Sequence, residues 1–195
     1  MRRVWYLLLG MAVFLAISAP VIAQVRPRPA LDPTVKEAIL TALDDERAAE
    51  AFYLAVMEEH GDVAPFDRIA EAEAQHQAAL LNLCAAYGIA VPVNPYDPNE
   101  ITVSGILAEC CQEAVAAEEA NVAMFNGYLT DLVLPWNVRQ VFTNLRDAAL
   151  NNHLPAFQRC ADGDCPDCPN DGSGPRPGRG PRKGPSTGPG PSGRR

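Results

Sequence analysis

The feature that most constrains this chain is a carboxylate and an imidazole, Glu73 and His76, three residues apart in a helical stretch. At that spacing both side chains leave one face of a helix about a turn apart and can reach one metal ion. The same face carries apolar residues at spacings of three and four, namely Phe66, Ile69, Leu80 and Leu83. The pair is also compatible with a surface glutamate beside a partly buried histidine. On a core-facing stripe, however, an unpaired carboxylate is costly, so the rest of the chain must supply a partner.

Apolar periodicity and capping residues predict an all-α protein with four helices and no strands. Asp32 caps the first helix, and Gly61 and Gly88 follow the first and second. Pro155 is expected to disturb the final turns of the fourth helix. Residues 88–103 contain three prolines and form a long crossover, whereas the other connections are short. The helices are predicted at about residues 33–60, 65–87, 104–132 and from 135 onward.

Each predicted helix carries ionisable residues near the middle of its apolar face. With connections that are short, long and short, these positions come to about the same height in a bundle. The result is a cluster of three carboxylates and two imidazoles, a donor set that suits iron first and manganese as an alternative. Such bundles hold two ions bridged by carboxylates. The predicted metal ligands are Glu46, Glu73, His76, Glu118 and His153.

Three stretches resemble the ferritin-like superfamily, in particular a group of little-characterised exported ferritin-like proteins of bacteria and archaea. They are residues 45–53 (DERAAEAFY), 66–76 (FDRIAEAEAQH) and 151–157 (NNHLPAF), and the resemblance spans about residues 35–160. It implies a ferritin-like four-helix bundle with a long crossover between helices 2 and 3.

The family's metal motifs match this chain residue by residue on the first two helices. They match at the interval from Glu46 to Tyr53 and at Glu73 with His76. The resemblance places Tyr53 beside the metal, where a phenol could bond a ligand carboxylate or serve in electron transfer. Glu118 matches the acid of the third helix, although Glu119 adjoins it and either residue could be meant; periodicity favours Glu118.

One departure concerns the fourth helix, where the family usually carries its own Glu-x-x-His. Here the residue three before His153 is Leu150, so the sixth ligand is missing. Glu50, one turn after Glu46 on the same stripe, is a candidate to compensate, and a solvated flank is its other interpretation. Because this acid is missing, three arrangements remain open: a symmetric two-metal centre, two metal ions with unequal ligand sets, and a single occupied metal site.

The two ends of the chain differ in composition from the part between them. Residues 1–23 combine Arg2-Arg3, a short apolar run and a small-residue cleavage site, which predicts a signal peptide and export to the periplasm or beyond the cell. Residues 24–31 form a short linker, and the bundle with a Cys-rich extension occupies residues 32–168. Residues 169–195, rich in Gly, Pro and basic side chains, are predicted to be a disordered tail.

Charge is distributed unevenly along the chain. Residues 30–170 carry six basic and 23 acidic side chains, a net charge of −17, and the tail is basic. The tail is a solvated extension, or it attaches to an anionic cell-surface polymer or to the acidic bundle itself. Nucleic acid is not expected as a partner of an exported chain, and a homodimer is compatible with the sequence.

The six cysteines are expected to form disulfides in an exported protein. Cys84 lies about 16 Å from the ligand level toward one end of the bundle, and Cys110 and Cys111 lie about 10–12 Å toward the other. They cannot meet, because a disulfide needs Cα atoms within about 7 Å. The fourth helix runs back and brings Cys160 to the level of Cys110 and Cys111. We predict that Cys160, Cys165 and Cys168 pair with Cys110 and Cys111 and that Cys84 stays a buried free thiol; a five-cysteine zinc cluster is the alternative.

These features favour a metal-dependent redox protein that binds iron, or manganese, and oxidises Fe(II) in a ferroxidase-like reaction with dioxygen or peroxide. Two other interpretations remain open. One is a disulfide-braced structural or interaction module whose polar core holds no metal. The other is an extracytoplasmic metal carrier without catalysis.

Overall fold

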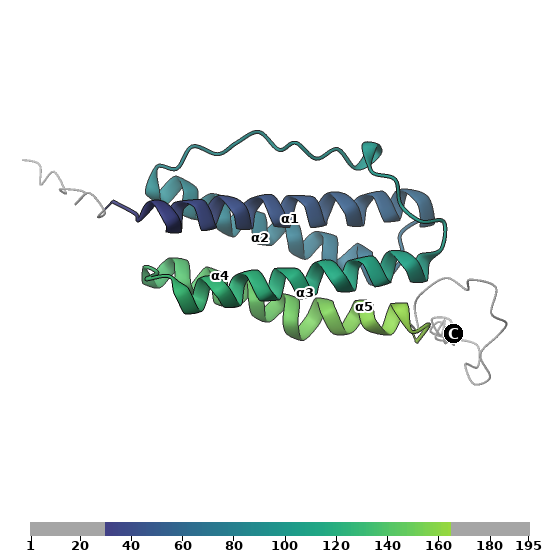
Figure 1. Cartoon of the computed structure of the whole chain (residues 1–195). Coiled ribbons are helices and arrows are strands. Elements are labelled where there is room, and N and C mark those ends of the chain that lie inside the picture. The colour runs from purple at the N-terminus through teal and green to yellow at the C-terminus, as the bar shows by residue number, and fades with distance from the viewer. Residues whose placement is uncertain (1–29, 165–195) are drawn as a thin grey trace, which may run out of the picture.

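The computed structural model describes residues 30–164, and every regular element in that range is helical. The all-α prediction is confirmed for this part of the chain. The helices lie side by side, with α1 next to α2, and α3 next to the row formed by α4, η2 and α5 (Figure 1). Their bounds are α1 Pro33–His60, α2 Phe66–Tyr87, η1 (3-10) Pro98–Glu100, α3 Leu107–Asp131, α4 Trp136–Ala148, η2 (π) Ala149–His153 and α5 Leu154–Ala161.

The helix ends follow the capping residues closely. Asp32 accepts a hydrogen bond from the backbone N–H of Thr34 at 2.8 Å and starts α1. Gly88, in the left-handed conformation at φ 65°, ends α2. α3 begins at Leu107, three residues later than predicted. The reason is that the Ser104 hydroxyl accepts a hydrogen bond from the N–H of Ile106 at 3.1 Å and holds this segment in a turn.

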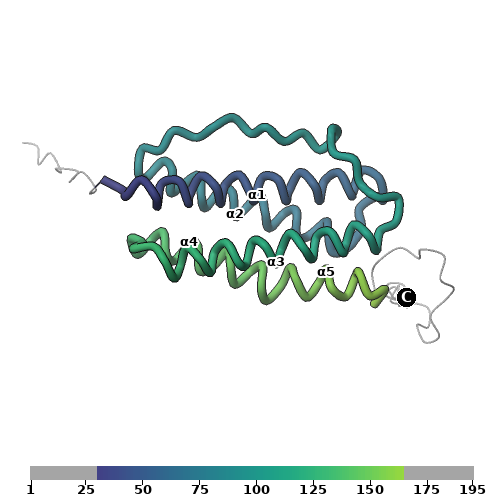
Figure 2. Tube along the Cα trace, viewed as in Figure 1, coloured from purple at the N-terminus to yellow at the C-terminus, as the bar shows by residue number. Residues whose placement is uncertain are grey.

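The connection from α2 to α3, residues 88–106, runs along α1 from one end of the molecule to the other (Figure 2). Two side chains of α1 hold it in place. Arg47 donates to the carbonyl of Pro92 at 3.1 Å, and Asp44 accepts from the hydroxyl of Tyr96 at 2.9 Å. α3 therefore begins at the end of the molecule opposite to the end of α2.

The last helical row contains one wide turn, the π-helix η2. Within it the N–H of Leu154 bonds to the carbonyl of Ala149, five residues back. Pro155 follows in the first turn of α5, a position where proline is tolerated. The disturbance predicted at Pro155 thus takes the form of a wide turn before it, and the helix continues to Ala161.

The buried residues form two apolar clusters, one toward each end of the molecule. One includes Ile39, Leu80 and Phe142, and the other includes Phe66 and Phe157. The side chains buried between these clusters are polar: Glu46, Glu73, Glu118, Asn121 and His153. The apolar packing at both ends holds the polar layer in place and shields it from solvent along the helix axes.

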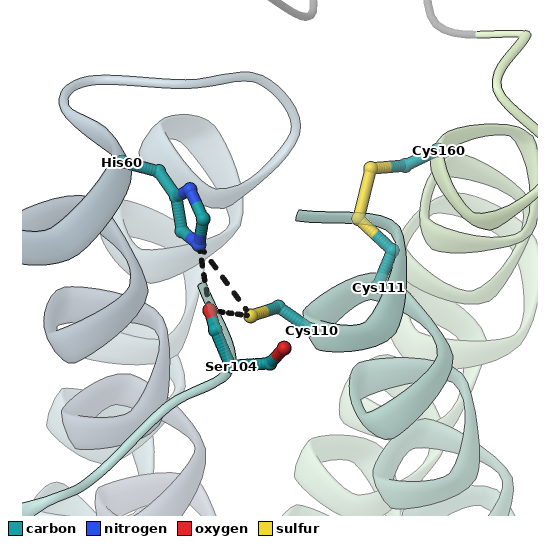
Figure 3. The surroundings of a disulfide bond; sticks show 5 residues. All are labelled: His60, Ser104, Cys110, Cys111 and Cys160. Atoms are coloured by element: carbon teal, nitrogen blue, oxygen red, sulfur yellow. Dashed lines mark hydrogen bonds between the residues drawn. A yellow bond between two sulfur atoms is a disulfide. The ribbon is translucent and has the colours of Figure 1, made fainter. Parts of the chain in front are cut away.

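A disulfide joins Cys111 at the start of α3 to Cys160 near the end of α5, with Cα atoms 5.8 Å apart (Figure 3). Cys84 is a buried free thiol. The predicted pairing of Cys160 with the start of α3 is confirmed, as is the free Cys84. Cys110 is the other free thiol among the described residues, and its sulfur lies 3.3 Å from the carbonyl oxygen of Ser104. With Cys111 oxidised, a five-cysteine zinc cluster does not form.

Other predictions fall on residues outside the described range. These are the signal peptide, most of the linker, the pairing of Cys165 and Cys168, and the basic tail. Among residues 30–164, none of the helices is long and apolar enough to cross a membrane.

Candidate metal centre

The structure brings the five predicted ligands together at one level of the helical bundle. Glu46 comes from α1, Glu73 and His76 from α2, Glu118 from α3 and His153 from the end of η2. They form two groups, Glu46 with Glu73 and His76, and Glu73 with Glu118 and His153. Within each group the potential ligand atoms lie within 4.8 Å of one another. The four residues other than His76 are almost fully buried.

Glu73 belongs to both groups because its two carboxylate oxygens point to different histidines. Oε2 lies 2.9 Å from Nδ1 of His76, and Oε1 lies 3.0 Å from Nδ1 of His153. Each imidazole also contacts a second carboxylate: His76 Nδ1 is 2.9 Å from Glu46 Oε2, and His153 Nδ1 is 3.3 Å from Glu118 Oε1. The arrangement is therefore two equivalent sets of two carboxylates and one imidazole that share Glu73.

The two histidines keep the buried carboxyl groups from repelling one another in the protein without metal. Burial lowers the pKa of His76, but hydrogen bonds to Glu46 and Glu73 outweigh it and raise that pKa to about 10. Burial likewise opposes the charged form of His153, and Glu118 and Glu73 raise its pKa to about 9. At neutral pH two imidazolium rings thus lie among three carboxyl groups.

The two carboxyl groups that face His76 titrate in opposite directions. Burial raises the pKa of Glu46 well above its usual range, and the hydrogen bond with Glu73 adds to this. Burial also works to raise the pKa of Glu73, but hydrogen bonds with Glu46, His153 and His76 lower it below its usual range. Glu46 and Glu73 therefore titrate together with His76 as one coupled group.

Tyr53 supports the group that contains Glu118. Its hydroxyl donates to Glu118 Oε1 at 2.8 Å, and its ring packs against Phe66 and Phe157 at centroid distances of 5.7 and 5.0 Å. Burial raises the pKa of Tyr53 well above its usual range, and the charges of Glu118 and Glu73 do so further. The phenol consequently keeps its proton and fixes the orientation of Glu118.

Asn121 supports the other group, and its role was not predicted. Its side-chain amide donates to Asp45 Oδ2 at 2.7 Å and to Glu46 Oε1 at 3.2 Å. Asn121 lies three residues after Glu118 on the apolar stripe of α3, so a polar residue on that stripe was the available signal. The sequence contains no such signal for Asp45, because this residue is adjacent to Glu46 and lies off the apolar stripe of α1.

Glu50, Glu119 and Leu150 lie outside both ligand groups. The Glu50 carboxylate accepts a hydrogen bond from Nε2 of Gln77 at 2.6 Å. Glu119 is exposed, whereas Glu118 is buried. Leu150 is 42% exposed, and Ala149, four residues before His153, is 2% exposed and faces the cluster instead. The π-turn causes this shift, because it places an extra residue in the turn that precedes His153.

A cavity of about 280 Å³ lies beside the two groups and contacts all five predicted ligands. The donor chemistry around it fits a divalent ion that accepts oxygen and nitrogen together, as iron and manganese do. The two imidazoles present Nδ1 toward the carboxylates, and Tyr53 and Asn121 orient the carboxylates from behind. Metal sites are usually supported by such outer hydrogen bonds.

Comparison with known proteins gives one finding on the fold. No protein-family model matches the chain, and no curated protein matches it. The crystal structure of a hypothetical protein from Methanococcus jannaschii is similar, with a TM-score of 0.62 and 20% sequence identity over 71% of this chain and 85% of that one. At this identity the similarity shows a shared fold alone.

Proposed function

We propose that the protein is a ferritin-like four-helix bundle, with a long crossover between α2 and α3, that binds iron between its helices. Manganese is the alternative metal. The observation that carries the proposal is Glu73, whose two oxygens each face a different histidine within a complete set of two carboxylates and one imidazole. Two equivalent, overlapping ligand sets favour two ions over a single site, even though the fourth helix lacks its own glutamate.

The roles of the residues follow from their contacts. Glu46 and Glu118 would each serve one ion, Glu73 would serve both, and His76 and His153 would bind through Nδ1. To bind metal each imidazole gives up the proton that the carboxylates now stabilise, so the positive charge of the metal replaces the charge of the imidazolium. Tyr53 and Asn121 would keep the two outer carboxylates in place.

When bound, iron supplies the capacity to exchange electrons with dioxygen or peroxide, and Fe(II) itself is the substrate of a ferroxidase-like reaction. The chain contributes a buried, pre-formed donor set whose apolar surroundings limit water to one side. Tyr53 would serve in electron transfer, and its hydrogen bond to Glu118 supports this role. An oxidase would oxidise the Fe(II) that it binds, whereas a carrier would bind the metal without oxidising it.

The proposal includes export of the mature chain through the predicted signal peptide. The disulfide between Cys111 and Cys160 supports an oxidising compartment, since such bonds persist outside the cytoplasm. The acidic character of residues 30–170 supports a protein that attracts cations. The basic tail is then available to hold the protein at an anionic cell-surface polymer.

Elemental analysis of protein secreted by its own host tests metal binding directly. We expect two iron or manganese ions per chain, and no metal in a preparation from which Glu73 has been removed. If the protein purified from its own host contains no metal, the proposal is wrong, and the alternative function, a structural or interaction module, is favoured. Addition of Fe(II) and dioxygen to the loaded protein then separates the two remaining functions: consumption of dioxygen marks an oxidase, and stable binding without consumption marks a carrier.

A further inference from the structure

The cavity beside the ligand cluster opens between α1 and α3, and both helices line it with one face. On α1 the lining residues are Asp45, Ala48, Ala49 and Phe52, which are spaced as neighbours on a helix surface. On α3 the facing residues include Glu113, Ala117 and Ala120 at the same spacing. Alanine at four of these positions leaves space between the two helices.

The position of the alanines shows that the cavity can be reached from solvent. Ala117 and Ala120 on α3 are exposed, and Ala48 and Ala49 on α1 are partly exposed. At the inner end lie the carboxylates and histidines of the cluster. A molecule that enters between the alanines therefore meets the ligand cluster without any movement of the helices.

The size of the cavity exceeds what metal ions, water or dioxygen require. An apolar cavity of about 150 Å³ is large enough for benzene, so one of about 280 Å³ accommodates a ring or a short chain with a substituent. The walls suit such a body, because Phe52 and the alanines are apolar. The cavity thus has the dimensions of a small-molecule site.

The charges around the cavity select against anions. Asp45 and Glu113 lie on the two walls, and among residues 30–164 no lysine or arginine lines the cavity. At the inner end the protonated His76 and His153 offset most of the charge of the three cluster carboxyl groups, so the unbalanced negative charge lies mainly on the two walls. An anionic ligand would meet repulsion at the walls, and a positively charged group would meet attraction. Aromatic Phe52 adds a surface that also favours a cation.

We propose that the cleft between α1 and α3 binds a small organic amine, with its ammonium group near Asp45 and Glu113 and its aliphatic or aromatic body against Phe52 and the alanines. The outer part of this site is formed by residues that are not metal ligands, its inner wall is the ligand cluster, and it is present in the protein without metal. Its occupant reaches the ligand cluster, which makes it a molecule positioned next to the metal.

Three probes of similar size that share a phenyl ring test the charge selection. Benzylamine, benzyl alcohol and benzoate are titrated into the purified protein by calorimetry, both metal-free and metal-loaded. We expect benzylamine to bind tightest, benzyl alcohol more weakly, and benzoate at least tenfold more weakly than the amine. Benzoate binding as tight as that of benzylamine, or no binding of any probe, would overturn the proposal.

Variants on α3 locate the site. Ala117→Leu fills the mouth of the cleft with an exposed side chain, so it should weaken benzylamine at least tenfold and leave the fold intact. Ala116→Leu, exposed one residue away and outside the cleft, is the matched control and should change nothing. Glu113→Gln should weaken the amine about two- to fivefold, as expected for a partly exposed charge pair, and Glu119→Gln should not. Equal binding in Ala117→Leu and Ala116→Leu would overturn the proposal.

Metal content is measured in the same samples, which keeps this inference separate from the proposed function. A protein that takes up no iron or manganese when either is added, yet binds benzylamine in a way that Ala117→Leu abolishes, would disprove the metal proposal and support the amine site. A protein that binds metal but none of the probes would support the metal proposal and disprove the amine site.

Discussion

The imidazole rings of His76 and His153 lie stacked, with centroids 5.5 Å apart and planes inclined by 23°. Two rings with raised pKa values would repel each other in this position. Glu73 lies between them and offers one oxygen to each Nδ1. The stack is therefore stable because a single carboxylate binds both rings, and the same carboxylate is the one shared by the two ligand groups.

This arrangement predicts how the stability of the metal-free protein depends on pH. The folded pKa values, about 10 for His76 and about 9 for His153, lie above the ordinary value of 6.5. A raised pKa gives stability that is fully present below pH 6.5 and is lost as the pH rises through 9 and 10. The melting temperature of metal-free protein should consequently fall between pH 7 and 10.

The matched variant for this measurement replaces both histidines with glutamine. In that variant the fall above pH 7 should disappear, because no group with a raised histidine pKa remains in the cluster. A fall of the same size in both proteins would assign the pH dependence to groups elsewhere in the chain.

A second prediction concerns metal stoichiometry and follows from the sharing of Glu73. Glu73→Ala should abolish the binding of both ions, whereas Glu46→Ala and Glu118→Ala should each remove one and retain the other. Glu58→Ala, on the solvent side of α1, is the control and should leave the content unchanged. Metal content is read by elemental analysis of folded, purified variants. Equal content in the Glu73 and Glu58 variants would contradict the site assignment.

Tyr53→Phe isolates the hydrogen bond to Glu118. We expect a stability loss of about 1 kcal/mol and a loss of about tenfold in metal affinity at the Glu118 group, as for other outer contacts of metal ligands. Tyr96→Phe removes an equivalent phenol-to-carboxylate bond at an exposed position and should have little effect. Chemical denaturation and metal titration measure the two quantities. If the two variants show the same stability and the same metal affinity, Tyr53 contributes only packing.

The disulfide offers a test of the fold that is independent of metal. The bond between Cys111 and Cys160 closes a sequence separation of 49 residues, and Cys111→Ala should cost about 3–4 kcal/mol of stability. Cys84→Ala removes a buried free thiol and should cost about 1 kcal/mol. Peptide mapping of unreduced protein checks the pairing: a bridge from Cys84 to the start of α3 would show that α2 and α3 are placed wrongly. Metal content should be the same in both variants.

Much of this structure could be predicted from local signals. The start and end of α1 follow from Asp32 and Gly61, and the ionisable residues on the apolar stripes were enough to predict the level of the cluster. Other features depend on tertiary contacts. Cys110 and Cys111 are adjacent, and only the packing of α3 against α5 selects Cys111 as the partner of Cys160. The amide bridge from Asn121 to Asp45 likewise requires that α1 and α3 be placed first.

The π-turn before His153 is the feature that sequence periodicity could least predict, because in a regular helix the missing sixth ligand would correspond to Leu150, three residues before His153. In the structure Ala149 faces the cluster and Leu150 faces solvent. The position that corresponds to the missing ligand is therefore Ala149. Glutamate variants at these two residues distinguish a π-turn, in which Ala149 faces the cluster, from a regular α-helical turn, in which Leu150 would face it.

Ala149→Glu should add a fourth carboxylate to the cluster. In metal-free protein the buried charge should lower stability by about 2 kcal/mol or more, since no additional partner is available for it. With metal bound the same carboxylate becomes a ligand, so the affinity should rise at least tenfold and the loaded protein should regain the lost stability. Leu150→Glu places its carboxylate in solvent and should change stability by no more than about 0.5 kcal/mol and leave affinity unaltered. Metal titration with thermal melting decides between them: tighter binding in Leu150→Glu and not in Ala149→Glu would mean that His153 is approached through a regular α-helical turn.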